Sequence, residues 1–141
     1  MFSPSICLDN LRLLVVDDDS DSRQILTLLF EFEGAKIICA ASALEALEVI
    51  SHFQPDILIT DICLPDEDGY WLLTKVKNLP ALKGRYVPAI ALTGMASEED
   101  REYSLRAGFQ KHLSKPIDLN ELVSVVANLA ESNQFVASIR T

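Results

Sequence analysis

Short apolar runs alternate along the chain with longer segments in which apolar residues recur at helical spacing. The apolar runs cover residues 12–16, 36–41, 56–60, 87–92 and 109–113. The first four are apolar at almost every position, which is typical of strands in a parallel sheet that is covered on both faces. Because strands and helices alternate strictly, we expect right-handed β–α–β crossovers. The pattern predicts an α/β fold around one five-stranded parallel sheet.

Each intervening segment predicts a helix with one apolar side. The first helix should end at Gly34, and the fourth should run from Ser97 to Ala107 with an acidic first turn that the helix dipole favours. The apolar side predicted for the first helix is Ile25, Leu28, Leu29 and Phe32, and for the second helix Ala43, Ala46, Leu47 and Ile50. For the third helix it is Leu72, Leu73 and Val76, and for the fifth helix Leu119, Leu122, Val123 and Val126.

Length and charge limit the function classes. The chain has 141 residues, of which 49% are hydrophobic, and this suits one domain, predicted over residues 11–130, between an N-terminal extension (1–10) and a C-terminal tail (131–141). The net charge of −9 disfavours nucleic acid and anionic membranes as partners. No apolar run approaches the length of a membrane span. The cysteines, Cys7, Cys39 and Cys63, are odd in number and widely spaced, which favours reduced thiols in a cytoplasmic protein.

Polar residues follow four of the five predicted strands. Asp17, Asp18 and Asp19 come after the first strand, Asp61 after the third, Thr93 after the fourth and Lys115 shortly after the fifth. Taken singly, each has a simpler explanation, such as helix capping, a turn or a solvated surface charge. In an open parallel sheet, however, all strands end at the same edge, and ligands bind in the crevice there. Their joint placement therefore predicts a site at this edge.

The predicted set of side chains suits phosphoryl transfer. Paired carboxylates provide the hard oxygen ligands of Mg²⁺, which keeps several waters and commonly also binds phosphate. Asp61 stands alone at the end of a central strand, so it is the candidate nucleophile that forms an aspartyl phosphate. Mg²⁺, the Lys115 ammonium and the Thr93 hydroxyl would each stabilise one oxygen of the transferred group.

Four segments carry a family resemblance. They are VVDDDSDSR, DILITDICLPDEDG, ALTG and LSKPID, and in this order and spacing the chain resembles the receiver (REC) domain of a two-component response regulator over residues 11 to about 130. The resemblance implies a flavodoxin-like, doubly wound (βα)5 three-layer sandwich with strand order 2-1-3-4-5.

The resemblance also implies a function. A histidine kinase or a histidine phosphotransfer protein would donate a phosphoryl group to Asp61, with Mg²⁺ held by Asp17 or Asp18, by Asp61 and by the backbone carbonyl of Cys63. Such a domain is no conventional enzyme, because it catalyses only its own phosphorylation and a slow autodephosphorylation. The phosphoryl group would switch a surface that binds a downstream protein, which the sequence does not identify.

Two details concern the switch. The family implies a cis peptide bond between Lys115 and Pro116 and a switch role for Thr93. Where members often carry Tyr or Phe, three residues before the lysine, this chain has His112. One interpretation of His112 is a partly exposed polar residue on an edge strand. The other is a rotamer switch that moves inward when Thr93 turns toward the phosphoryl group.

Two alternatives from other classes remain open at this point. A haloacid-dehalogenase-like phosphatase also uses Asp, Thr or Ser, Lys and Mg²⁺, but its nucleophile lies early in the chain and its acidic metal ligands lie late, the reverse of the order here. A phosphate-independent binding module could keep the fold without the chemistry. Within the receiver interpretation, we expect a stand-alone single-domain regulator that is a monomer or a weak dimer.

Overall fold

One parallel sheet forms the middle of the molecule. The structure, a computed structural model, describes residues 8–95 and 97–140, and the side chains among them up to Ser132. The strands are β1 (Arg12–Val16), β2 (Lys36–Ala40), β3 (Ile57–Asp61), β4 (Ala89–Thr93) and β5 (Lys111–Ser114). All neighbours pair in parallel, in the order β2-β1-β3-β4-β5. The predicted fold and strand order are confirmed.

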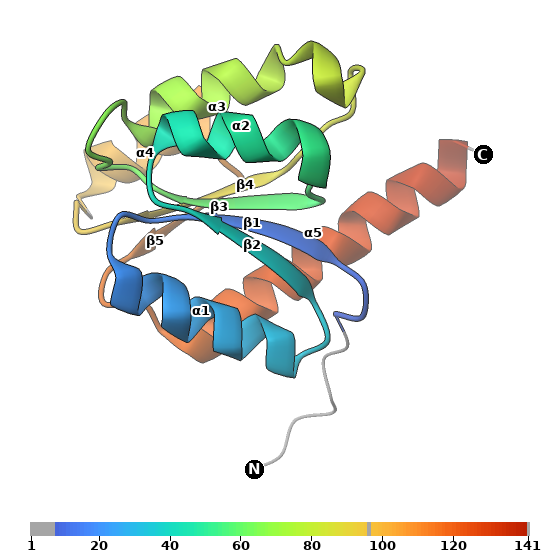
Figure 1. The fold of residues 1–141 in the computed structure, drawn as a ribbon, viewed down its shortest axis with the longest axis horizontal. Coiled ribbons are helices and arrows are strands. Elements are labelled where there is room, and N and C mark those ends of the chain that lie inside the picture. The colour runs from blue at the N-terminus through green and yellow to red at the C-terminus, as the bar shows by residue number, and fades with distance from the viewer. Residues whose placement is uncertain (1–7, 96, 141) are drawn as a thin grey trace.

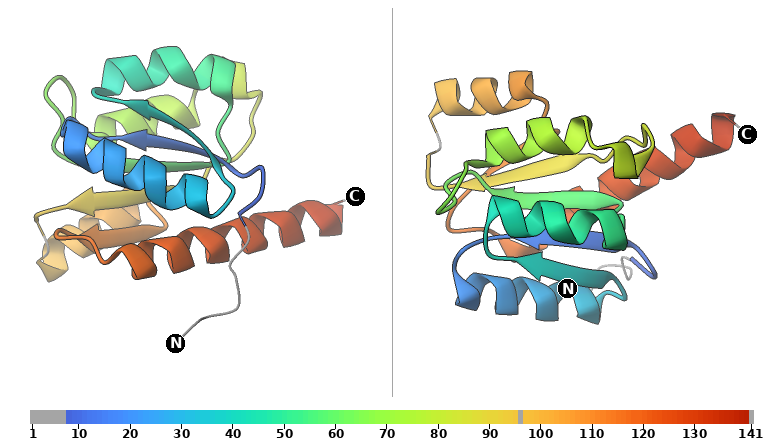
Figure 2. Two further views of the ribbon diagram at one scale, coloured as in Figure 1. Left: turned by 60° about the horizontal axis from the view of Figure 1, so that its bottom comes forward. Right: turned by 45° about the horizontal axis from the view of Figure 1, so that its top comes forward.

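Helices cover both faces of the sheet. They are α1 (Ser20–Phe32), α2 (Ala43–Phe53), α3 (Gly69–Lys77), α4 (Glu98–Ala107) and α5 (Leu119–Arg140), with a short 3₁₀ helix at Pro80–Leu82. In Figure 1, α2 and α3 lie above the sheet, and α1 and α5 lie below it. The right-hand view of Figure 2 shows α4 on the same side as α3. The result is the expected three-layer sandwich.

The two faces of β1 explain why the predicted strands are so uniformly apolar. Successive side chains of a strand point to opposite faces of the sheet. Leu14 and Val16 belong to the core beneath α2 and α3, whereas Leu13 and Val15 belong to the core that α1 and α5 close. All four are fully buried. A strand with two buried faces has no position left for a polar residue until it reaches the edge of the sheet.

The buried side predicted for α1 is wrong at three of its four residues. Leu29 is partly buried against the core, but Ile25, Leu28 and Phe32 are 51%, 62% and 88% exposed. The fully packed residues are instead Leu26 and Phe30. The reason is that α1 carries apolar residues around most of its circumference, so helical spacing alone does not single out one side. The packing of α1 against the sheet selects the side that is buried.

The structure adds detail at both ends of the predicted domain. Leu122, Val123 and Val126 of α5 are buried as predicted, but Leu119 is partly exposed because it lies in the first turn. Residues 131–140, expected to be a tail, continue α5, which runs past the end of the sheet (Figure 2, left). Of the expected N-terminal extension, residues 1–7, Cys7 included, lie outside the described residues, while Leu8 is buried. No helix in the described part of the chain is long and apolar enough to cross a membrane.

Candidate functional site

Side chains from four strands converge at one edge of the sheet. Asp17 directly follows β1, Asp61 ends β3, Thr93 ends β4 and Lys115 directly follows β5. Because the strands are parallel and in register, their carboxyl ends lie next to each other, with Asp61 beside Leu92 and Thr93 beside Ser114. The edge that the sequence points to is therefore a single site.

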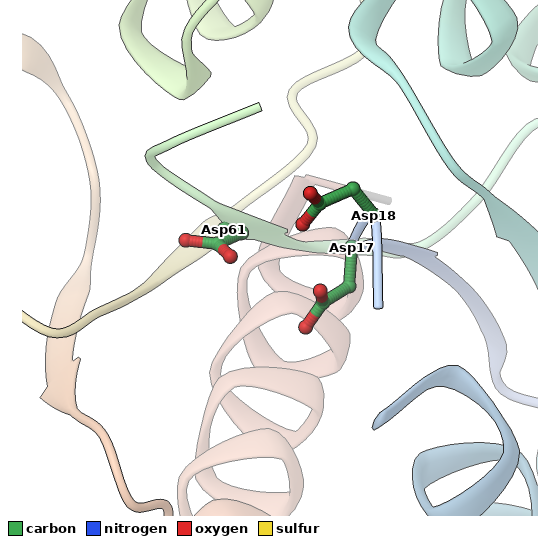
Figure 3. A group of neighbouring side chains, drawn as sticks. All are labelled: Asp17, Asp18 and Asp61. Carbon is green, nitrogen blue, oxygen red and sulfur yellow. The ribbon is translucent and has the colours of Figure 1, made fainter. Parts of the chain in front are cut away.

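Three aspartates form a cluster of carboxylates. One oxygen from each of Asp17, Asp18 and Asp61 lies within 4.8 Å of the other two. Figure 3 shows these side chains at the ends of the neighbouring strands β1 and β3. Asp17 and Asp61 are buried, whereas Asp18 is exposed, so the cluster opens to solvent on one side. Three hard oxygen donors with one open side fit Mg²⁺, which takes few carboxylates and keeps several waters.

The third aspartate of the run after β1 has a structural role. The Asp19 carboxylate caps α1 by accepting hydrogen bonds from the Ser22 backbone N–H (3.2 Å) and hydroxyl (2.8 Å). The hydrogen bond from the Ser22 hydroxyl lowers the pKa of Asp19. Two acids of the loop after β3 act in the same way: Asp66 accepts from backbone N–H groups at the start of α2, and Asp68 caps α3. Capping and site formation thus fall on different aspartates.

Lys115 is the cation among these acids. Its Nζ donates to Asp61 Oδ2 at 2.8 Å and lies 3.5 Å from Asp17 Oδ2. Burial by itself lowers the pKa of Lys115, but the hydrogen bond to Asp61 and the charges of Asp17 and Asp61 outweigh it, so the pKa is raised. The ammonium therefore stays charged at neutral pH and links the ends of β1, β3 and β5.

Burial leaves Asp17 in an unfavourable environment for its charge. Burial raises the pKa of Asp17, and the nearby Asp61 carboxylate raises it further. The Asp19 N–H, which donates to Asp17 Oδ1 at 2.9 Å, and the Lys115 ammonium oppose this shift without cancelling it. One ammonium among three carboxylates leaves a net negative site, and a divalent cation would neutralise it.

Two loops are tied together at Thr93. The Thr93 hydroxyl is buried and accepts a hydrogen bond from the Met95 N–H at 3.0 Å. The backbone N–H of Lys115 donates to the Thr93 carbonyl at 2.8 Å. The peptide bond between Lys115 and Pro116 is cis, as the resemblance implied. The backbone hydrogen bond between Thr93 and Lys115 therefore joins the two loops that carry the Thr93 hydroxyl and the Lys115 ammonium.

Gly69 supports the position of Asp61, a role that the sequence alone does not indicate. The Gly69 N–H donates to the Ile62 carbonyl at 2.8 Å, which folds the loop back onto the end of β3. A Cβ atom at Gly69 would lie 2.8 Å from the Asp61 carbonyl oxygen and 3.0 Å from Ile62 Cα. The Cys63 N–H donates to Asp61 Oδ1 at 3.2 Å. The Asp-Gly pair at residues 68 and 69 was a signal for a turn only.

The expectation that His112 is partly exposed is wrong. The side chain is 4% exposed and faces α4. Its Nδ1 is hydrogen-bonded to Ser104 Oγ at 2.8 Å, and its Nε2 to the Met95 carbonyl at 3.0 Å. Although β5 is an edge strand, α4 covers the face on which His112 lies and provides polar partners that no local pattern reveals.

Comparison with known proteins shows to which family the chain is similar. The family model for the response regulator receiver domain matches residues 13–127. An uncharacterized 14.6 kDa protein from the sodA1 3′ region of Leptolyngbya boryana is 44% identical over 119 residues, which make up 84% of this chain and 89% of that protein.

Two further relatives cover most of this chain. The response regulator SaeR of Staphylococcus epidermidis is 34% identical over 126 residues, which make up 86% of this chain but only 53% of SaeR. The solved receiver domain of the Francisella response regulator 1452 superposes with a TM-score of 0.79 at 30% identity, covering 88% of this chain and 99% of that domain. This chain belongs to the family of response regulator receiver domains, which are signalling domains of two-component systems and not conventional enzymes.

Proposed function

We propose that this chain accepts a phosphoryl group on Asp61 from the phosphohistidine of a histidine kinase or a histidine phosphotransfer protein. The observation that carries the proposal is the Asp61 carboxylate, which stands among two further acids and the Lys115 ammonium at one edge of the sheet. In the reaction, an Asp61 oxygen forms a bond to phosphorus while the bond from phosphorus to the histidine nitrogen breaks. The products are an acyl phosphate and a free histidine.

Each neighbour of Asp61 has a proposed part. Asp17, Asp18, Asp61 and the backbone carbonyl of Cys63 would hold Mg²⁺, which neutralises charge on the phosphoryl oxygens when it is bound. The Cys63 N–H holds one Asp61 oxygen, which orients the other toward the donor. The Lys115 ammonium, now on Asp61 Oδ2, would pass to a phosphoryl oxygen.

The phosphoryl group would act as a switch through its charge. It adds about −1.5 to −2 charge units to an already acidic site, so Lys115 and the Thr93 hydroxyl should be drawn toward it. Movement of Thr93 would remodel the surface of α4, β5 and α5, to which a downstream protein binds. We expect slow autodephosphorylation, because neither Cys63 nor Met95 carries a side chain suited to orient an attacking water; mass spectra recorded after removal of the donor would follow it.

We also propose that the chain works as a stand-alone regulator, as a monomer or a weak dimer. It matches 89% of the length of the Leptolyngbya relative, which supports this proposal. It spans about half of SaeR, so the activity of SaeR as a whole is not carried over.

Intact mass spectrometry after incubation with Mg²⁺ and acetyl phosphate tests the proposal. We expect a gain of about 80 Da, the mass of one phosphoryl group. The gain should vanish in Asp61→Asn and persist in Asp21→Asn, a matched change at an exposed aspartate of α1. A gain that survives in Asp61→Asn would contradict the assignment of the acceptor. Steady turnover of a phosphate monoester would favour a phosphatase instead, and no gain at all would favour a phosphate-independent module.

A further inference from the structure

A chain of hydrogen-bonded side chains runs through the interior between α3, α4 and β5. Tyr70 Oη lies 2.9 Å from Ser104 Oγ, and Ser104 Oγ lies 2.8 Å from His112 Nδ1. His112 Nε2 continues the chain to the Met95 carbonyl at 3.0 Å. Ser104 is fully buried and His112 nearly so. Ser104 and His112 are thus removed from competing water, where a satisfied polar network is most effective in holding its members in place.

With a neutral His112 ring, the chemistry of the groups assigns the direction of every hydrogen bond. The Met95 carbonyl can only accept, so His112 Nε2 must carry a proton. In the neutral ring Nδ1 is then an acceptor, and the Ser104 hydroxyl donates to it. Ser104 Oγ is left to accept from the Tyr70 hydroxyl. The network is therefore complete with His112 in one tautomer, in which Nε2 is protonated.

The network ends beside Thr93. The Met95 backbone is held on both sides: its N–H donates to Thr93 Oγ1 at 3.0 Å and its carbonyl accepts from His112. The Met95 side chain is 56% exposed, so apolar packing does little to fix this residue. Among the described residues, the hydrogen bonds of the Met95 backbone to Thr93 and to His112 hold this part of the loop between β4 and α4.

We propose that Ser104 is a positioning residue, which holds the His112 ring against the Met95 carbonyl and so supports the Met95 backbone and the Thr93 hydroxyl at the phosphorylation site, with Tyr70 extending the network to α3. The inference deepens the proposed function and rests on it for the part that Thr93 plays. It gives α3 and α4 a polar connection to the site that runs through backbone and buried side chains. It also gives His112 a task in the inward position that it occupies.

The first test is the tautomer of His112, measured by ¹⁵N NMR of the imidazole rings in the full chain at alkaline pH. The chain has two histidines, and the exposed His52 is an internal reference. We expect His112 in the Nε2–H tautomer. The Nδ1–H tautomer would overturn the inference, because Nε2 could then not donate to the Met95 carbonyl.

The second test is amide hydrogen exchange at Met95. In Ser104→Ala, which removes one hydroxyl and little volume, we expect exchange at Met95 to accelerate on the order of fivefold, as for the loss of one hydrogen bond. His112→Phe should do the same, and the double variant should add little to either single change because all three break one network. Ser124→Ala on the exposed side of α5 and His52→Ala are the matched controls and should leave Met95 unchanged.

Two outcomes of this test would overturn the inference. One is unchanged exchange at Met95 in folded Ser104→Ala. The other is acceleration of equal size throughout the chain, because this would mark a general loss of stability and not a local connection.

A third measurement separates this inference from the proposed function. With acetyl phosphate, Ser104→Ala should slow phosphorylation of Asp61 severalfold while Mg²⁺ binding stays unchanged, since no metal ligand is altered. Unchanged phosphorylation together with faster exchange at Met95 would overturn the connection to Thr93. The NMR and exchange experiments need no phosphoryl donor, so failure of wild-type Asp61 to be modified would count against the proposed function and leave their results intact.

Discussion

At the scale of single residues, three consecutive aspartates have three different environments. Asp17 is buried against Lys115, Asp18 is exposed at the rim of the site and Asp19 caps α1. Two carboxylates about 4 Å apart repel by about 4 kcal/mol at an effective dielectric constant of 20. The run is tolerated because one member is turned away to the helix and an ammonium lies near another. The remaining repulsion, from the Asp61 carboxylate, acts on Asp17 and helps to raise its pKa.

Replacement of Asp17 by Asn should stabilise the metal-free protein. The pKa of Asp17 is raised mainly by burial, so the folded state binds the proton more tightly than the unfolded state, and stability is lost as the pH rises from the unfolded pKa through the folded pKa. Asn keeps an acceptor for the Asp19 N–H. In EDTA at neutral pH, we expect the Tm to rise on the order of a few degrees.

The pH dependence of this effect provides its control. The advantage of Asp17→Asn should shrink as the pH falls through the folded pKa of Asp17, because the wild-type carboxyl is then neutral as well. Calorimetry in EDTA at several pH values would measure it. A Tm that falls at neutral pH would mean that the charge of Asp17 contributes stability even without metal.

Gly69 shows how a residue without a side chain shapes the site. In Gly69→Ala, the new Cβ would press on the backbone of Asp61 and Ile62, which cannot swing away as a side chain could. We expect a loss of about 1–3 kcal/mol in the free energy of unfolding, the usual cost of overpacking, and slower phosphorylation of Asp61. Urea denaturation would measure the first effect. Gly94→Ala is the control for stability, since a Cβ there meets no atom within 4 Å; equal losses in both variants would contradict the argument.

At the scale of elements, α1 shows why an apolar pattern does not always define a buried side. The helix has Asp19 as its N-cap and ends before Gly34, whose φ of 93° lies in the left-handed region that glycine adopts without strain. These local signals predict where the helix begins and ends. Its rotation about its own axis depends instead on the shape of the sheet surface, against which Leu26 and Phe30 pack.

A pair of identical substitutions tests the orientation of α1. Leu26→Ala should lower the free energy of unfolding by about 2–5 kcal/mol, because it opens a cavity in the core. Leu28→Ala, two residues along the same helix, should change it by no more than about 0.5 kcal/mol, because that side chain is largely exposed. Urea denaturation of both variants gives the comparison. The reverse order would mean that the side predicted from the sequence is the buried one.

At the scale of the whole molecule, the net charge of −9 and the acidic site both attract cations. The overall field attracts cations, and the carboxylates at the ends of β1 and β3 concentrate this attraction at one point. Folding brings these acids together, so a cation that binds them stabilises the folded state over the unfolded one.

Mg²⁺ should therefore raise the thermal stability of the whole domain. A ligand that binds only the folded state adds about 2.7 kcal/mol at a concentration one hundred times its Kd. We expect the Tm to rise with the logarithm of the Mg²⁺ concentration and EDTA to reverse the effect. NaCl at matched ionic strength is the control for screening. A Tm that does not respond to Mg²⁺, or responds equally in Asp17→Asn, would contradict the proposed metal site.

Sequence reasoning was most successful where a residue's role follows from its place along a strand. A strand buried on both faces must be apolar until it ends, so the polar residues that follow four of the strands could be found from the sequence alone. Because the strands pair in parallel, these residues were expected at one edge of the sheet. Strand ends were displaced by one or two residues at β2, β3, β4 and β5, because the boundary between a strand and its loop is set by hydrogen bonds to neighbouring strands.

The sequence by itself determined the alternation of strands and helices, the parallel sheet and the polar residues at its edge, because these depend on local periodicity and chain order. Only the tertiary structure decided which side of α1 is buried, that Asp19 caps the helix while Asp17 and Asp18 lie beside Asp61, that Gly69 packs against the Asp61 backbone, and that Ser104 is hydrogen-bonded to His112. Each of these depends on which surfaces meet across long separations in the chain. Contacts of that kind leave no regular spacing in the sequence.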